Sequence, residues 1–306
     1  MARLGDLLEK TSRTFALSIP PLPEPTRREV TIAYLLFRIA DTFEDAAHWA
    51  PEARIGALHD FVGLLRSASR EEAVRLSAAW TAAGASPHAG YRELIAEVPD
   101  VLGAFFALSP GAIPPIRDHV VRSADGMAGI VARTRGGTLV LTTVEELKEY
   151  CYIVAGIVGE MLTELFLLGR GSLAPVAPVL RSKSATFGEA LQLVNILKDS
   201  EDDANEGRRY LPEAVPKAEI FALARRDLGT AEAYIETLRA AGAPRGILEF
   251  TALPVQLAWA ALEKVESRGP GAKVSRPEVY RITQRVKRAL DRGESPVSPS
   301  AAGRRA

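Results

Sequence analysis

Apolar residues recur at helical spacing along most of this chain. Val30, Ala33, Phe37 and Ala40 follow one another at intervals of three or four residues, which places them on one face of an α-helix. A β-like pattern is confined to residues 138–143 and is too short to build a sheet. The pattern therefore predicts an all-α fold. The predicted helices cover residues 30–40, 53–65, 94–108, 116–131, 144–168, 186–205, 218–241, 247–268 and 277–291.

The domain organisation follows from the lack of an internal linker. The chain has 306 residues, and a prior of roughly 150 residues per domain would suggest two domains. No Pro-, Gly- or Ser-rich stretch within residues 1–291 is long enough to divide it, so we predict one domain there. Residues 292–306 are rich in Ser, Pro, Gly and Ala, and we expect a disordered tail.

Composition excludes several classes of protein. The 38 Lys and Arg residues balance 38 Asp and Glu residues, which argues against a nucleic-acid partner bound through a broad basic field. Cys151 is the single cysteine, so no intramolecular disulfide or multi-cysteine metal site can form. The first residues lack the apolar run of a signal peptide. We expect a reducing, cytoplasmic location.

The most apolar stretch, residues 150–168, contains Glu160 and Glu164. Each carboxylate at the centre of a bilayer would cost roughly 2.5–3.5 kcal/mol or more. We therefore predict a buried helix here and no transmembrane helix.

Acidic side chains are concentrated in two turns of otherwise apolar helices. In the first turn, Arg38, Asp41 and Asp45 share a helical stripe and Glu44 lies beside it. The second turn continues a stripe of polar residues at intervals of three and four. Its members are Gln192, Asn195, Asp199, Asp202 and Glu206, with Asp203 one turn beyond Asp199.

Like charges one turn apart destabilise a helix, so a bound cation would offset a local cost. Carboxylate pairs suit Mg²⁺, a hard ion that prefers oxygen ligands and keeps positions for water and phosphate oxygens. Two such turns facing each other would clamp a diphosphate, with arginines nearby to bind its oxygens. The alternative is that each turn is only a solvated helix face.

Five segments, in order along the chain, resemble the squalene/phytoene synthase family. The acidic turns DTFED (41–45) and NILKDSEDD (195–203) are similar to the family's aspartate-rich motifs. TSRTFALSIP (11–20), YCYIVAGIVGEMLTELF (150–166) and EGRRYLP (206–212) resemble its N-terminal, central and post-motif segments. The resemblance implies an isoprenoid-synthase helical bundle around a central apolar cavity. It also implies Mg²⁺-dependent head-to-head joining of two prenyl diphosphates.

The resemblance also implies roles for individual residues. Tyr150 would lie near the reacting carbons, and Phe15 would line the pocket. Asp41, Asp45, Asp199 and Asp203 would hold Mg²⁺ and diphosphate, with Glu44 and Asp202 as further ligands. Substrate contacts would come from Ser12, Arg13, Arg38, Gln192, Asn195 and Arg208.

DTFED is closer to the first motif of the squalene-forming relatives than to that of many phytoene synthases. This favours two molecules of farnesyl diphosphate, joined through presqualene diphosphate to squalene, with NADPH supplying hydride. Lys273 and Arg276 loosely resemble the basic segment linked with NADPH. The alternatives are phytoene or dehydrosqualene formed by proton loss without NADPH, presqualene diphosphate as the end product, or a non-catalytic assembly factor. We also expect transient contact with membranes, which would deliver or receive apolar molecules.

Overall fold

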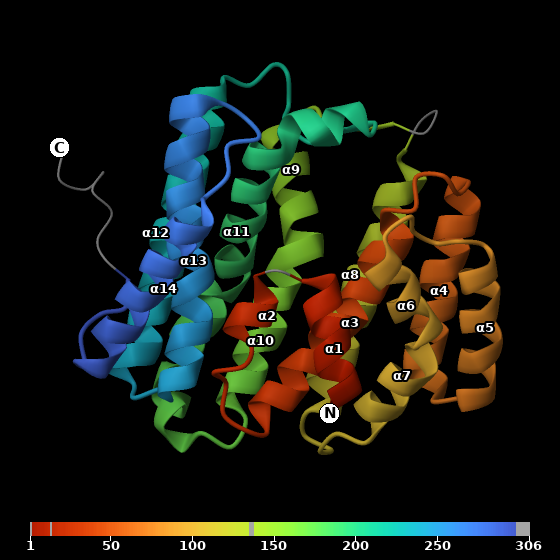
Figure 1. The fold of residues 1–306 in the computed structure, drawn as a ribbon, viewed down its shortest axis with the longest axis horizontal. Helices are drawn as coiled ribbons and strands as arrows, with labels where there is room; N and C mark the ends of the chain where they lie inside the picture. Colours follow the sequence, from red (N-terminus) through yellow and green to blue (C-terminus); the bar gives the residue numbers. More distant parts are fainter. Residues whose placement is uncertain (1, 13, 135–137, 298–306) are drawn as a thin grey trace. The chain divides into compact units, whose positions relative to one another are not determined.

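A computed structural model describes residues 2–12, 14–134 and 138–297. The chain divides into two compact units, and Figure 1 colours them along the sequence. One unit comprises Met1–Pro20 and Glu24–Leu139, and the other comprises Pro21–Pro23 and Val140–Ala306. The prediction of a single domain over residues 1–291 stays a prediction.

Helices joined by short turns and loops make up the described part of the first unit, apart from Leu139 of strand β1 (Leu139–Val140). α3 packs against α4, α7 and α8, and its side chains Ile32, Leu35 and Ile39 are fully buried. Asp41 and Asp45 therefore lie at the end of a helix fixed by tertiary contacts. The helices of this unit are α1 (Ala2–Thr11), α2 (Phe15–Ser18), α3 (Thr26–Glu44), α4 (Pro51–Ser67), α5 (Arg70–Ala82), α6 (Ala89–Ala96), α7 (Val98–Phe106) and α8 (Ile113–Ala132).

The second unit is built around the long helix α11, which packs against α10, α12 and α13 (Figure 1). A short strand β1 (Leu139–Val140) pairs with β2 (Arg208–Arg209). The other elements are α9 (Val144–Cys151), the π-helix η1 (Tyr152–Gly156), α10 (Ile157–Leu167), the 3₁₀-helix η2 (Gly171–Val176), α11 (Ala177–Asn205), α12 (Lys217–Ala240), α13 (Arg245–Arg268) and α14 (Arg276–Asp291).

The all-α prediction is confirmed, but some predicted boundaries are wrong. The helix predicted over 94–108 is two helices, because Pro99 begins a new first turn in α7. The helix predicted over 144–168 is interrupted by η1, where one residue more per turn is accommodated. Thr143 caps α9 by accepting a hydrogen bond from the N–H of Glu146 at 3.1 Å, as its spacing predicts.

Glycines bring η1 and α10 close to α11. A Cβ on Gly159 would collide with the carbonyl oxygen of Ser184, and one on Gly188 with that of Ala155. The stretch Val144–Leu167 has the length and apolar character of a membrane-spanning helix, but 61% of its most apolar window is buried inside the structure. These contacts agree with a core helix, as the two glutamates predict.

The predicted tail begins with ordered contacts. The hydroxyl of Ser295 donates a hydrogen bond to the carboxylate of Glu236, and Val297 is buried. The rest of the predicted disordered tail, residues 298–306, lies outside the described residues.

Candidate functional site

The first acidic turn lies at the C-terminal end of α3. Arg38 is 3.3 Å from the carboxylate of Asp41, and its guanidinium lies 5.6 and 5.5 Å from the ring centres of Tyr34 and Tyr91. Its Nε also donates to the hydroxyl of Tyr34 at 3.3 Å. Tyr34 in turn donates to the carbonyl of Thr11 at 2.8 Å. Arg38 is therefore held in place by residues far apart in the sequence.

Electrostatics in this turn favour a further cation. Burial raises the pKa of Asp41 to about 6, and the nearby carboxylate of Asp45 adds to the increase, while Arg38 opposes it. Burial lowers the pKa of Arg38, but Asp41, Tyr34 and Tyr91 together outweigh this, and the net shift is upward. One arginine thus does not fully compensate the two carboxylates. A divalent cation would stabilise both in their ionised form.

Residues of the predicted N-terminal segment lie in the same unit. The hydroxyl of Ser12 accepts a hydrogen bond at 2.9 Å from the N–H of Phe15, the first residue of the short helix α2. The ring centres of Phe15 and Tyr34 are 5.4 Å apart. Phe15 therefore packs against the same tyrosine that contacts Arg38. Arg13, predicted to bind substrate, lies outside the described residues.

Glu44 differs from the other acids of the turn. It is only 4% exposed, whereas Asp45 is exposed at the C-cap of α3. Its carbonyl oxygen accepts a hydrogen bond from Arg54 of α4, which fixes this end of α3. Burial makes Glu44 less accessible to a metal ion than Asp41 or Asp45, and its role as a further ligand stays a prediction.

The second acidic turn lies in the last part of α11. Lys198 lies 3.1 Å from the carboxylate of Asp199 and donates to the side-chain oxygen of Asn195, also at 3.1 Å. Arg208 bridges Asp203 at 3.3 Å and Glu206 at 2.6 Å. Asp202 is exposed, and Gln192 is partly exposed two turns nearer the start of the stripe. The structure thus joins the predicted stripe to Arg208 and to a lysine beside it.

Tyr150 is buried at the end of α9 and contacts a residue that the sequence did not single out. Its hydroxyl donates to the hydroxyl of Tyr210 at 3.0 Å, and the ring centres are 4.5 Å apart. Tyr210 follows Arg208 and Arg209 in EGRRYLP. The sequence did offer a signal, because Tyr210 lies two positions after Arg208, a predicted substrate-binding residue. Only the fold shows that Tyr210 contacts Tyr150.

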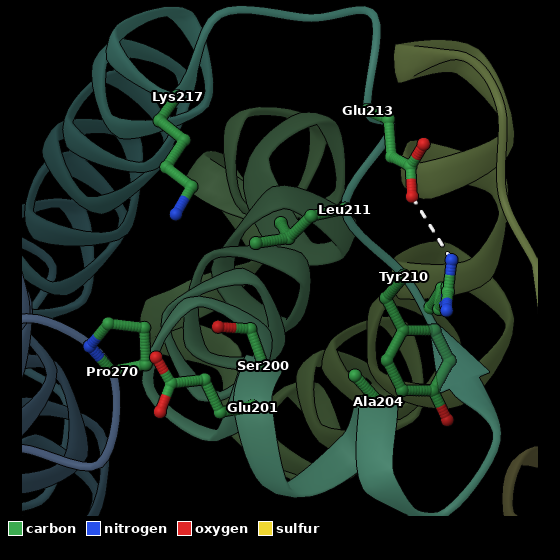
Figure 2. A pocket seen from close by; sticks show the side chains of 9 residues that line it. Ser200, Glu201, Ala204, Tyr210, Leu211, Glu213, Lys217 and Pro270 are labelled. Carbon is green, nitrogen blue, oxygen red and sulfur yellow. Dashed lines mark hydrogen bonds and ion pairs between the residues drawn. The ribbon is translucent and has the colours of Figure 1, made fainter.

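A pocket of about 380 Å³ lies behind the second acidic turn. In Figure 2, Lys217 extends its ammonium group into this region, while the hydroxyl of Tyr210 is directed away from Lys217. The residues of α11 that line the pocket are Ser200, Glu201 and Ala204, which are not members of the acidic stripe. Asp199 and Asp203 are not among the lining residues. Its lining residues are Ser200, Glu201, Ala204, Arg209, Tyr210, Leu211, Glu213, Lys217 and Pro270.

The segment with the predicted NADPH residues runs beside α11. The N–H of Gly271 donates to the carbonyl of Lys198 at 2.7 Å, which ties this segment to the second acidic turn. Lys273 and Arg276 are exposed, and Ser275 forms a capping box with Glu278 at the start of α14. Binding of NADPH by Lys273 and Arg276 stays a prediction.

Among residues 2–12, 14–134 and 138–297, no three His, Cys, Asp or Glu side chains form a ready-made metal site. Each turn offers a small set of carboxylates instead. That number suits Mg²⁺, which commonly takes one or two carboxylates and completes its shell with water and substrate phosphate. The donor set therefore fits this metal. That the two turns face each other stays a prediction.

Comparison with known proteins gives the family. The family model for squalene/phytoene synthase matches residues 8–285. The chain belongs to the squalene/phytoene synthase family. The matched range includes both acidic turns, Tyr150 and the segment with Lys273 and Arg276.

Curated relatives carry the names of squalene synthases. The chain is 30% identical over 215 residues to squalene synthase ERG9 of Candida albicans, covering 70% of this chain and 46% of that protein. It is 31% identical over 215 residues to the squalene synthase of Schizosaccharomyces pombe, covering 70% of this chain and 44% of that protein. The chain thus spans about half the length of the curated relatives it matches.

Solved structures share the fold. A structure of TcSQS with the ligand BPH1237 matches with a TM-score of 0.73 at 23% identity, covering 95% of this chain and 88% of that chain. A dehydrosqualene synthase in complex with a ligand matches with a TM-score of 0.57 at 21% identity, covering 95% and 96%. At these identities the likeness establishes the all-helical fold alone.

Proposed function

We propose that this protein is a Mg²⁺-dependent prenyltransferase that joins two molecules of farnesyl diphosphate head to head and converts the resulting presqualene diphosphate to squalene. The observation that carries the proposal is the pair of acidic turns within a family-matched chain, each with a cation bonded to its carboxylates. The alternative is that each turn is only a solvated helix face. The contacts of Arg38 with Tyr34 and Tyr91 argue against it, because a solvated face needs no such support.

In this proposal the carboxylates of Asp41, Asp45, Asp199 and Asp203 hold Mg²⁺. The bound metal supplies positive charge that stabilises the departing diphosphate. Arg38 and Arg208 add hydrogen bonds to phosphate oxygens, and the guanidinium fork suits this task. Because Arg38 is already ordered by aromatic neighbours, little reorganisation is needed when charge develops.

Loss of diphosphate leaves an allylic cation, which must be kept from water until the second substrate attacks it. We assign this protection to an apolar cavity and the orientation of the reacting carbons to Tyr150. An aromatic ring stabilises a nearby cation through its π face, and a phenol hydroxyl accepts or returns a proton. Phe15, Gln192 and Asn195 complete the lining in this proposal.

The final step to squalene requires a hydride, and NADPH supplies it when bound. Lys273 and Arg276 would hold its phosphate groups. The bond from Gly271 to Lys198 supports this assignment, because it keeps the segment beside the second acidic turn.

The decisive experiment incubates the purified full chain with farnesyl diphosphate and Mg²⁺, with and without NADPH, and identifies the products by mass spectrometry. We expect presqualene diphosphate without NADPH and squalene with it. A hydrocarbon that forms equally without NADPH would replace squalene by dehydrosqualene as the product, and phytoene would require the longer geranylgeranyl diphosphate. No diphosphate release from either substrate would refute the enzyme proposal and favour a non-catalytic role.

A further inference from the structure

Tyr210 forms a buried pair with Tyr150. The two residues are 5% and 4% exposed, and their hydroxyls are 3.0 Å apart. A buried phenol hydroxyl is costly to leave without a hydrogen-bond partner. The hydrogen bond between them therefore contributes to satisfying both buried hydroxyls.

The rings add a second constraint. Their centres are 4.5 Å apart and their planes are inclined by 31°. The ring contact limits the tilt of Tyr150, while the hydrogen bond fixes the direction of its hydroxyl. Replacing Tyr210 by phenylalanine would keep the first constraint and remove the second.

Tyr210 is itself held by its chain neighbours. Arg208, two residues earlier, bonds Asp203 and Glu206 of the second acidic turn. The carbonyl of Arg209 accepts a hydrogen bond from the N–H of Leu141 at 2.9 Å. One short segment thus connects the carboxylates of the turn to the hydroxyl of Tyr150.

We propose that Tyr210 is a positioning residue: it holds the hydroxyl of Tyr150 in the orientation needed beside the reacting carbons. The inference rests on the proposed function and assigns to that site a residue that acts through Tyr150. Because Arg208 and Tyr210 belong to one short segment, that segment contacts both the second acidic turn and Tyr150.

The test is a double-mutant cycle on the full chain, with Tyr150→Phe, Tyr210→Phe and the double variant. Tyr280→Phe is the matched control, because Tyr280 lies in the same unit and is 66% exposed. We expect Tyr150→Phe to lower kcat about 100-fold, the scale of general acid–base assistance. Tyr210→Phe should lower kcat about 10-fold with KM changed less than about twofold, and the double variant should match Tyr150→Phe alone.

Multiplicative effects of the two substitutions, or an unchanged kcat in Tyr210→Phe, would overturn the proposal. A lower kcat in the control would show that the loss is not specific to the pair. A second cycle measures urea unfolding of the same variants and does not depend on activity. Additive unfolding effects would show that the hydroxyls are not coupled and would also overturn the proposal. If the wild type releases no diphosphate, the proposed function fails, and the catalytic positioning role fails with it. Coupling of the two hydroxyls in the unfolding cycle would in that case establish only the hydrogen bond.

Discussion

The two acidic turns carry the same chemical groups in different surroundings. In the first, Arg38 and Asp41 have side chains 25% and 26% exposed, and Arg38 packs against the nearby Tyr34 and against Tyr91, which is distant in sequence. In both turns the cations lie close in sequence to the acids, and Arg208 and Asp203 of the second are 20% and 18% exposed. Lys198 adjoins Asp199, and Arg208 follows Asp203 by five residues.

The difference teaches how each turn acquires its geometry. The first depends on tertiary packing, which partly buries its charges and raises the pKa of Asp41 to about 6. The second depends on local sequence and on the glycine contacts that fix the helix carrying it. Substitutions can therefore separate the chemistry that the turns share from the support that they do not.

The largest effect should come from removing a proposed metal-binding carboxylate from either acidic turn. We expect Asp41→Asn and Asp199→Asn each to slow diphosphate release by about 1,000-fold, or about 4 kcal/mol of transition-state stabilisation. Far-UV circular dichroism should remain that of the wild type, because neither change removes core volume. Normal Mg²⁺-dependent release in both variants would contradict the metal-binding assignment.

Added methyl groups should disturb the packing of α11, the helix that carries the second turn, against η1 and α10. Gly159→Ala and Gly188→Ala should each lower the free energy of unfolding by about 1–3 kcal/mol, because a Cβ would strike backbone of the facing segment. The control is Gly229→Ala, where a Cβ meets no atom within 4 Å and helix propensity favours alanine by about 1 kcal/mol. Urea unfolding measures both. Equal stability of all three variants would mean that the helices are not in close contact.

Glu232 is a second carboxyl whose pKa is raised mainly by burial, as that of Asp41 is. Burial raises the pKa of Glu232 to about 7 from an ordinary 4.5, and the charge of Glu236 adds to the increase, while Trp259 and Gln256 oppose it. Well below pH 4.5 this carboxyl is protonated in both the folded and the unfolded protein, so its burial does not change stability with pH. As the pH rises from 4.5 through about 7, the carboxyl ionises more readily in the unfolded protein, and the free energy of unfolding falls. Glu232→Gln should thus stabilise the protein by about 2 kcal/mol at pH ~8 and have little effect at pH ~4.5. A constant difference in thermal stability between these pH values would argue against this carboxyl.

The smallest effects concern the two cations. Arg38→Lys removes the fork that reaches Asp41 and Tyr34, and we expect KM for farnesyl diphosphate to rise about tenfold. Lys198→Arg keeps the charge at a partly exposed site, so we expect a change below about twofold. Steady-state kinetics with both variants checks the contrast. If both substitutions changed KM equally, the support around Arg38 would have no functional value.

Much of the fold could be predicted because it is encoded locally. Apolar spacing located the main helices, and the Thr143 cap was visible as a residue type at a defined distance from Glu146. The helices α1 and α5 and the π-helix were missed. Short or weakly amphipathic helices give little periodic signal, and a π turn follows from packing against α11 rather than from propensity.

The sequence by itself determined which groups are available: two acidic turns on helices, the arginines near them, and Tyr150 in an apolar segment. Helical periodicity is a local property, so it is legible in one chain. The tertiary structure decided which of these groups are buried and what they touch. It placed Arg38 among tyrosines, buried Glu44, and paired Tyr150 with a residue 60 positions away. Burial and long-range hydrogen bonds depend on the packing of distant segments, and that packing sets the pKa values and side-chain orientations on which the proposed chemistry depends.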